Sequence, residues 1–178
     1  MGVREGVQPG LEGEIETNLL LSQEFSGSNI HNGFYLPAEL LEKALKLAVV
    51  NGIDIHKIIS VEDLNDLKKV VYTKGIEALL IDITAEMTRD SQINNSSLDR
   101  CRQVITLAED YAKKIDYSEV NDKIVDRLLE SAKFYGLQEG KEILYRFCLK
   151  EAKKYALKKG INVVNRISNL ESELSSRN

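Results

Sequence analysis

The sequence predicts an all-α protein of about seven helices in antiparallel hairpins, and three observations predict this fold class. Beyond residue 36, apolar residues recur three or four positions apart, which is the period of one face of an α-helix. Only two of the 178 residues are proline, so long helices are permitted. Polar and glycine-containing segments separate these apolar stretches, and no stretch has a convincing strand pattern. Such hairpins close into a helical bundle or lie side by side as a helical array.

An irregular N-terminal arm is predicted for residues 1–36, ahead of a single all-α domain over residues 37–178. The arm holds six of the eleven glycines and one of the two prolines. Glycine opposes regular structure because it loses more backbone entropy on ordering than other residues do. A short helix over Glu14 to Phe25 is the one regular element that we consider within it. Three alternatives are open for the arm: its apolar groups could dock on a partner chain, they could lie on the protein's own body, or the arm could be disordered.

The first three helices of the domain are predicted over residues 37–51, 60–75 and 76–88. Pro37 suits the first turn of a helix. Ser60 can cap the next one, with Asp63 three residues later. Each of these helices but the last precedes a Gly-Ile pair, and a glycine there can take the left-handed conformation while the isoleucine packs back on the last turn. We therefore expect Gly52 and Gly75 to end the helices before them.

Four further helices are predicted over residues 97–115, 119–135, 141–160 and 163–174. Ser96 or Ser97 is expected to cap the first of them, and Gly160, again followed by isoleucine, to end the third. The patterning of residues 97–174 resembles tetratricopeptide-type helical hairpins, although the Trp, Leu-Gly and Pro positions of that family are missing. The resemblance implies a helical array and no particular ligand.

Composition and motifs exclude several classes of protein. No apolar run approaches the roughly 18 residues of a membrane span, so we expect a cytoplasmic protein. Cys101 and Cys148 have no CxxC spacing and are expected to pack as small apolar groups. His31 and His56 lie in no ligand or base pattern. Since there is no phosphate-binding loop and no nucleophile elbow, no cofactor is expected.

The most distinctive segment is the predicted helix at residues 141–160. It carries seven basic and two acidic residues, a net charge of +5 in a chain of net charge −4. Basic residues at three- and four-residue spacing form one stripe that could contact an anionic partner, including nucleic acid. They are Arg146, Lys150, Lys153, Lys154 and Lys158. Tyr145, Phe147 and Tyr155 of the same helix could in principle stack on bases.

A second set of charges suggests a metal site. Asp82, Glu86 and Asp90 are four residues apart, so a helix through all of them would project three carboxylates along one face. Carboxylate oxygens are the ligands that Mg²⁺ and Ca²⁺ require. Such a site could hold a phosphorylated small molecule through the metal.

These patterns lead to three functional hypotheses. The first is a non-enzymatic helical interaction or accessory module that presents helix faces to a protein partner, including another copy of itself as a homo-oligomer. The second is a nucleic-acid-associated accessory protein that uses the basic helix. The third is a Mg²⁺-dependent enzyme that acts on a phosphorylated small molecule through the helix carboxylates. The first is favoured because no motif in the sequence specifies a reaction.

Overall fold

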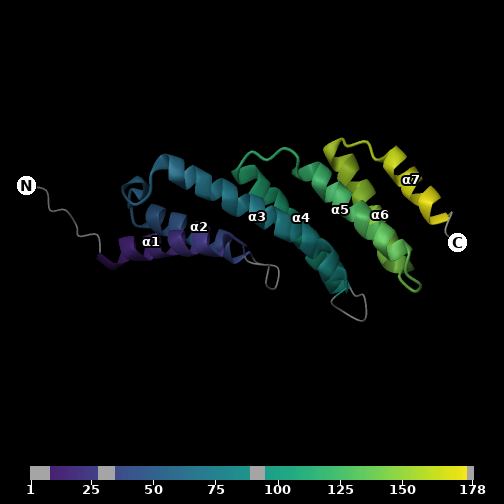
Figure 1. Ribbon diagram of the computed structural model, residues 1–178, viewed down its shortest axis with the longest axis horizontal. Helices are drawn as coiled ribbons and strands as arrows, with labels where there is room; N and C mark the ends of the chain where they lie inside the picture. The colour runs from purple at the N-terminus through teal and green to yellow at the C-terminus, as the bar shows by residue number, and fades with distance from the viewer. Residues whose placement is uncertain (1–8, 28–34, 89–94, 176–178) are drawn as a thin grey trace, which may run out of the picture. The chain divides into compact units, whose positions relative to one another are not determined.

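The protein is all-α within the residues that the computed structural model describes, which are 9–27, 35–88 and 95–175, with the backbone alone at 9, 27, 84–88 and 95–97. These residues form seven α-helices and two short 3-10 helices, with no strand among them (Figure 1). The predicted fold class is therefore confirmed. In chain order the elements are α1 (Pro9–Glu24), η1 (Phe25–Gly27), α2 (Leu36–Val50), η2 (Ile55–Lys57), α3 (Val61–Thr88), α4 (Asn95–Lys114), α5 (Val120–Gly136), α6 (Glu142–Lys159) and α7 (Val164–Ser175).

The chain divides into two compact units, residues 1–78 and residues 79–178. The boundary between them lies within α3. In the first unit α1 packs along α2, and η1 contacts both helices. The predicted boundary after residue 36 thus falls inside the first unit.

The prediction of an irregular arm is wrong for residues 9–24, which form α1. The inward face of α1 has helical spacing, but two of its four buried positions are polar, which hides the pattern in the sequence. These positions are Ile15, Asn18, Leu19 and Ser22. The Ser22 hydroxyl donates a hydrogen bond to the Pro37 carbonyl oxygen at 2.8 Å, so it fastens α1 to the start of α2. The short helix considered over Glu14 to Phe25 is real but begins earlier.

The prediction that Gly75 ends a helix is also wrong, because α3 continues through it as one helix of 28 residues. The buried positions keep a single helical phase across the glycine, from Val71 through Ile76 to Leu79 and Ile83. A glycine inside a helix costs only about 1 kcal/mol relative to alanine, and burial of several aliphatic side chains outweighs that cost. The predicted cap at the start of this helix is confirmed, since the Ser60 hydroxyl accepts a hydrogen bond from the Asp63 amide at 3.1 Å.

Two of the three predicted glycine stops are confirmed, after α2 and after α6. Gly52 and Gly160 have φ values of +64° and +71°, in the left-handed region that favours glycine. The amides of the following residues, Ile53 and Ile161, donate to the carbonyls five residues back, each at 2.9 Å. This is the hydrogen-bond pattern of a Schellman motif, which satisfies carbonyls at the helix end.

Helices α4 to α7 belong to the second unit and follow one another with short connections (Figure 1). Helices α5 and α6 form the closest pair, while α5 also contacts α4 and α7. The buried positions of α4 and α5 are those that the helical spacing predicts, such as Cys101, Ala108, Ile124 and Leu128. This arrangement confirms the prediction of packed helical hairpins and positions the outer face of α6.

Candidate interaction surfaces

The basic stripe predicted on residues 141–160 lies on the outer face of α6. All five predicted cations of the stripe are exposed, and none has a hydrogen bond or ion pair to another described residue. They are Arg146, Lys150, Lys153, Lys154 and Lys158. The two charged residues of α6 that contact α4, Glu151 and Lys159, are both paired. The structure thus separates the inward charges, which stabilise the fold, from the outward ones, which are available to a partner.

Two aliphatic side chains share this outer face. Ile143 and Leu157 are 65% and 85% exposed, and Lys150 lies midway between them along the helix. Residues seven positions apart lie nearly in line on a helix, because seven residues make almost two full turns. The surface is therefore a cationic stripe with an exposed aliphatic group at each end. We call it the α6 face and define it by Ile143, Leu157 and the five cations.

The aromatic residues of α6 do not lie on the α6 face. Phe147 and Tyr155 are both 8% exposed, and the Tyr145 ring lies near Gly136, at the end of α5, so it too packs inward. The suggestion that these rings stack on bases is therefore not supported for Phe147 and Tyr155, which are buried. The contacts that the α6 face offers are aliphatic and cationic.

An ion pair between α4 and α6 involves a buried carboxylate. Glu151 is 7% exposed, and its Oε1 lies 2.9 Å from Nη2 of Arg102. Arg102 also pairs with Asp99 and stacks over the Phe147 ring at 5.6 Å. These hydrogen bonds raise the pKa of Arg102, with Glu151 as the largest cause. The pair fixes the inward side of α6 against α4.

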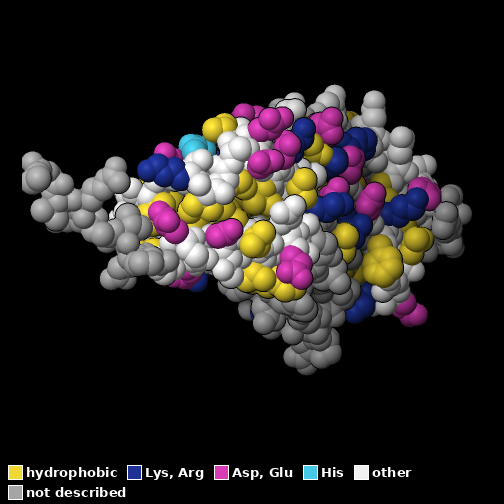
Figure 2. Space-filling view, turned by 60° about the vertical axis from the view of Figure 1, so that its left-hand side comes forward, with side chains coloured by type: hydrophobic (Ala, Val, Ile, Leu, Met, Phe, Trp, Pro, Cys, Tyr) yellow, Lys and Arg dark blue, Asp and Glu magenta, His cyan; other side chains and the backbone are white. Residues whose placement is uncertain are grey.

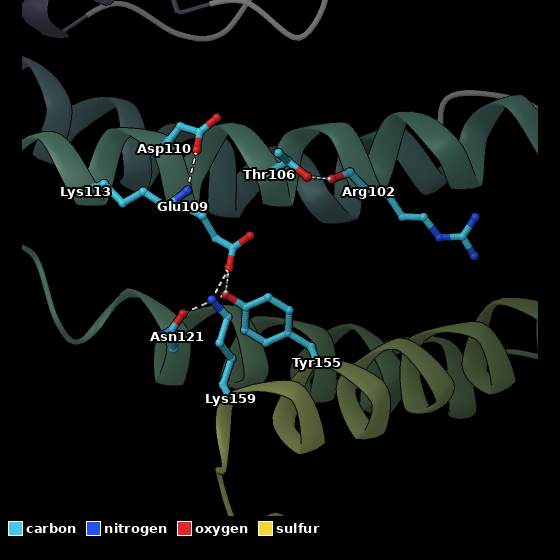
Figure 3. A network of polar contacts seen from close by, with 8 residues as sticks. All are labelled: Arg102, Thr106, Glu109, Asp110, Lys113, Asn121, Tyr155 and Lys159. Carbon is cyan, nitrogen blue, oxygen red and sulfur yellow. Dashed lines mark hydrogen bonds and ion pairs between the residues drawn. The ribbon is translucent and has the colours of Figure 1, made fainter.

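A second polar network ties the end of α6 to α4 and α5 (Figure 3). The Tyr155 hydroxyl lies 2.9 Å from Glu109 Oε1 and 2.8 Å from Asn121 Oδ1, and Lys159 Nζ lies 2.5 Å from the same Glu109 oxygen. Burial raises the pKa of Glu109, but the hydrogen bonds from Lys159 and Tyr155 outweigh it and hold that pKa below its usual value. Burial, and then Glu109, raise the pKa of Tyr155.

This network does not have the properties of an active site. A shallow hollow of about 230 Å³ adjoins it, lined in part by Glu109, Asn121 and Lys159. Glu109 pairs with Lys159, and Tyr155 lies within hydrogen-bond distance of both Glu109 and Asn121. Lys159 also lies over the Tyr155 ring. A group that is committed to internal partners must lose them before it binds a ligand. We therefore assign the network a structural role.

The network predicts an acid-dependent stability effect. Because the folded pKa of Glu109 is lowered, its contribution is present above its unfolded pKa of about 4.5 and is lost as the pH falls through the folded value. Glu109→Gln is expected to lower the free energy of unfolding by about 1–2 kcal/mol at neutral pH, with a smaller difference near pH 3. Urea unfolding at several pH values measures it. Asp110→Asn, which breaks an exposed pair with Lys113, is the matched control and should change stability little. A Glu109→Gln effect that stays constant down to pH 3 would contradict the lowered pKa.

An apolar groove lies in the first unit, between α1 and the segment from η2 into α3. Its volume is about 410 Å³. Leu20 and Val70 on its walls are 59% and 49% exposed, which is unusual for aliphatic groups that lie together. The apolar lining consists of Leu19, Leu20, Ile58, Ile59, Leu67 and Val70. Figure 2 shows apolar side chains gathered on a face of the protein with acidic side chains beside them.

The rim of the groove is acidic. Of the described residues that line it, three are carboxylates and none is a lysine or arginine. Glu16 and Asp66 have no ion pair to another described residue, and Asp63 is held in place by the Ser60 hydroxyl at 2.6 Å. An apolar floor with an acidic rim complements a segment that carries both aliphatic and cationic side chains. We call this surface the acidic groove, defined by the six apolar lining residues with Glu16, Asp63 and Asp66.

Sequence reasoning did not find the acidic groove. One signal was present, since three consecutive leucines at residues 19–21 cannot all face one side of a helix, so at least one has to be exposed. Ile58 and Ile59 also stand outside any helical pattern. That these two segments lie together follows only from the tertiary structure.

The acidic trio predicted as a metal site is only partly described. Asp82 is a buried residue of α3, and Glu86 lies in the same helix, where its side chain is not described. Asp90 lies outside the described residues. No group of three or more potential metal-ligating side chains occurs among the residues with described side chains. A metal site formed by the trio stays a prediction.

The two cysteines and His56 are the remaining candidate residues in the described part of the chain. Cys101 and Cys148 are fully buried in the second unit, which confirms that they pack as apolar groups, and burial raises the pKa of the Cys148 thiol. His56 is exposed in η2, whereas His31 lies outside the described residues. Among the described helices, none is long and apolar enough to cross a membrane. Comparison of the chain with protein-family models, with curated proteins and with solved structures finds no match in any of the three.

Proposed function

We propose that this protein is a helical interaction module without catalytic function, and that the acidic groove binds a cationic, amphipathic segment of a protein partner. The observation that carries the proposal is that exposed aliphatic side chains and three carboxylates line the same groove of about 410 Å³. Burial of exposed Leu20 and Val70 against a partner would contribute roughly 1–2 kcal/mol each. The carboxylates would select a cationic partner and speed its association.

A second candidate is contact with nucleic acid through the α6 face. Five exposed cations on one helix face favour it, because each can neutralise a phosphate. Two observations favour a protein partner instead. The aromatic rings of α6 that are needed for base stacking are buried at Phe147 and Tyr155. In addition, Ile143 and Leu157 gain more from an apolar protein surface than from a phosphate backbone.

Site-specific cross-linking tests the proposed function. A photoreactive phenylalanine at position 70 lies in the acidic groove. The same group at position 49 replaces Val49, which lies on α2 outside the groove and is more exposed than Val70, at 82% against 49%. In cells that naturally produce the protein, we expect protein adducts from position 70 and few from position 49. The double substitution Glu16→Lys and Asp66→Lys should remove the adducts, because the partner segment is cationic. Equal adducts at both positions, or adducts that survive charge reversal, would contradict the proposal.

A further inference from the structure

We propose that the occupant of the acidic groove is the α6 face of a second copy of this protein. The inference rests on the proposed function and names the partner. It follows from three matches between the two surfaces, in charge, in apolar contact and in spacing.

The charges of the two surfaces are complementary. The lining of the acidic groove, as far as the structure describes it, has three carboxylates and no basic residue. The α6 face has five cations, and the one acidic residue between Ile143 and Leu157, Glu151, is turned inward to Arg102. Among the described residues of its own unit, neither set of charges is neutralised, apart from the hydrogen bonds of Asp63 to Ser60 and the proximity of Lys158 to Glu109. Opposite charges that lack such neutralisation attract each other at a distance and fix the register of contact.

The apolar parts of the two surfaces also match. Leu157 is 85% exposed, the highest exposure among the large aliphatic side chains of the described residues. The acidic groove offers six apolar side chains around a volume of about 410 Å³, enough to receive a projecting leucine. A leucine that leaves water for such a site gains roughly 2 kcal/mol. This makes Leu157 the expected anchor of the contact.

The spacing of the α6 face brings its cations to the rim. Lys153 and Lys154 precede Leu157 by four and three residues, and Lys158 follows it directly. On a helix Lys153 and Lys154 are the surface neighbours of Leu157, one turn before it. With Leu157 in the groove, we expect these lysines to meet the exposed carboxylates of Glu16, Asp63 and Asp66.

The proposed contact joins two different surfaces, so it is heterologous. Each copy carries one acidic groove and one α6 face. Two copies that exchange both contacts form a closed dimer, and copies that exchange only one extend into a chain. Both assemblies are self-association that depends on protein concentration and weakens with salt, because exposed ion pairs are screened.

Charge reversal on both surfaces tests the inference by sedimentation velocity of the full-length chain. The groove variant Glu16→Lys with Asp66→Lys and the face variant Lys150→Glu with Lys154→Glu should each weaken self-association at least about tenfold. The two variants mixed together, or all four substitutions in one chain, should restore association to within about threefold of the original, because each reversed surface then meets a complementary one. Lys46→Glu with Lys57→Glu removes the same positive charge outside both surfaces and should change association little.

An apolar pair of variants gives an independent measurement. Leu157→Ala should weaken self-association about tenfold, and Val49→Ala, a change at a side chain of similar exposure (82%), should leave it unchanged. All substituted positions are exposed, so circular dichroism is expected to show native helix content in every variant.

Three outcomes would overturn the inference. One is a chain that stays monomeric at every protein concentration and at low salt. The second is failure of the mixed variants to restore association. The third is a face variant that loses binding to a single-stranded oligonucleotide but associates with itself as the unmodified chain does. The proposed function is tested separately. Cross-links from position 70 to a different protein would support the interaction module but would show that a second copy is not its partner.

Discussion

Arg102→Ala is expected to lower the free energy of unfolding by about 3 kcal/mol, the largest effect of any single charge removal that we consider. The substitution leaves the carboxylate of Glu151, which is 7% exposed, without the guanidinium 2.9 Å away. An uncompensated buried charge is costly because it has lost both its hydration and its partner. The Phe147 ring loses its cation–π contact at 5.6 Å as well. Urea unfolding followed by far-ultraviolet circular dichroism measures the difference.

Two further variants show whether the loss of stability comes from the buried Glu151 charge. Lys113→Ala breaks an ion pair on the same helix whose partners are 72% and 48% exposed, so it should cost less than about 1 kcal/mol. Combining Arg102→Ala with Glu151→Leu removes both charges and should recover much of the lost stability. If Arg102→Ala cost no more than Lys113→Ala, the Glu151 carboxylate would have to be hydrated in solution.

Ile15→Ala is expected to lower the free energy of unfolding of the first unit by about 3 kcal/mol. Ile15 is fully buried on the inward face of α1, and its truncation removes apolar contacts and leaves a cavity. An irregular arm would tolerate this change. Thermal and urea unfolding measure the effect, which therefore reports directly on whether α1 packs against α2 in solution.

Leu20→Ala is the matched control on the same helix. Leu20 is 59% exposed, so the substitution should change stability by only about 0.5 kcal/mol. It should nevertheless weaken self-association, because Leu20 lines the acidic groove. The two variants thus separate folding from binding within α1. If Ile15→Ala and Leu20→Ala destabilised the protein equally, α1 would not bury Ile15 and expose Leu20 in solution.

The helices could be predicted from the sequence wherever the buried positions are apolar. In α4 and α5 the positions three and four residues apart are buried as the period requires, as at Cys101, Ala108, Ile124 and Leu128. In α1 the prediction failed because Asn18 and Ser22 occupy half of the buried face. Their side chains donate hydrogen bonds to Glu14 and Pro37 carbonyl oxygens, and these bonds make the burial of polar groups possible. Periodicity in hydrophobicity cannot reveal such a face.

The glycines show the limit of a local rule. The same Gly-Ile pair ends α2 and α6 but lies inside α3. The pair is followed by polar or loop-forming residues in the first two cases, whereas after Gly75 the apolar phase continues at Leu79 and Ile83. Packing along the whole of α3 therefore determines whether Gly75 adopts the left-handed conformation. A rule that considers only two residues cannot include the free energy of packing along the rest of the helix.

The sequence by itself determined that this chain is helical, where most helices begin and end, and that one helix carries a cationic stripe, because these properties follow from side-chain spacing along a single element. Only the tertiary structure decided which α6 charges are neutralised. Glu151 and Lys159 meet α4 residues 49 and 50 positions earlier in the chain, and no local pattern encodes such pairs. The acidic groove has the same origin, since α1 and the start of α3 line it together. Contacts between distant segments depend on how helices pack, and packing is the sum of many small terms that a single helix does not contain.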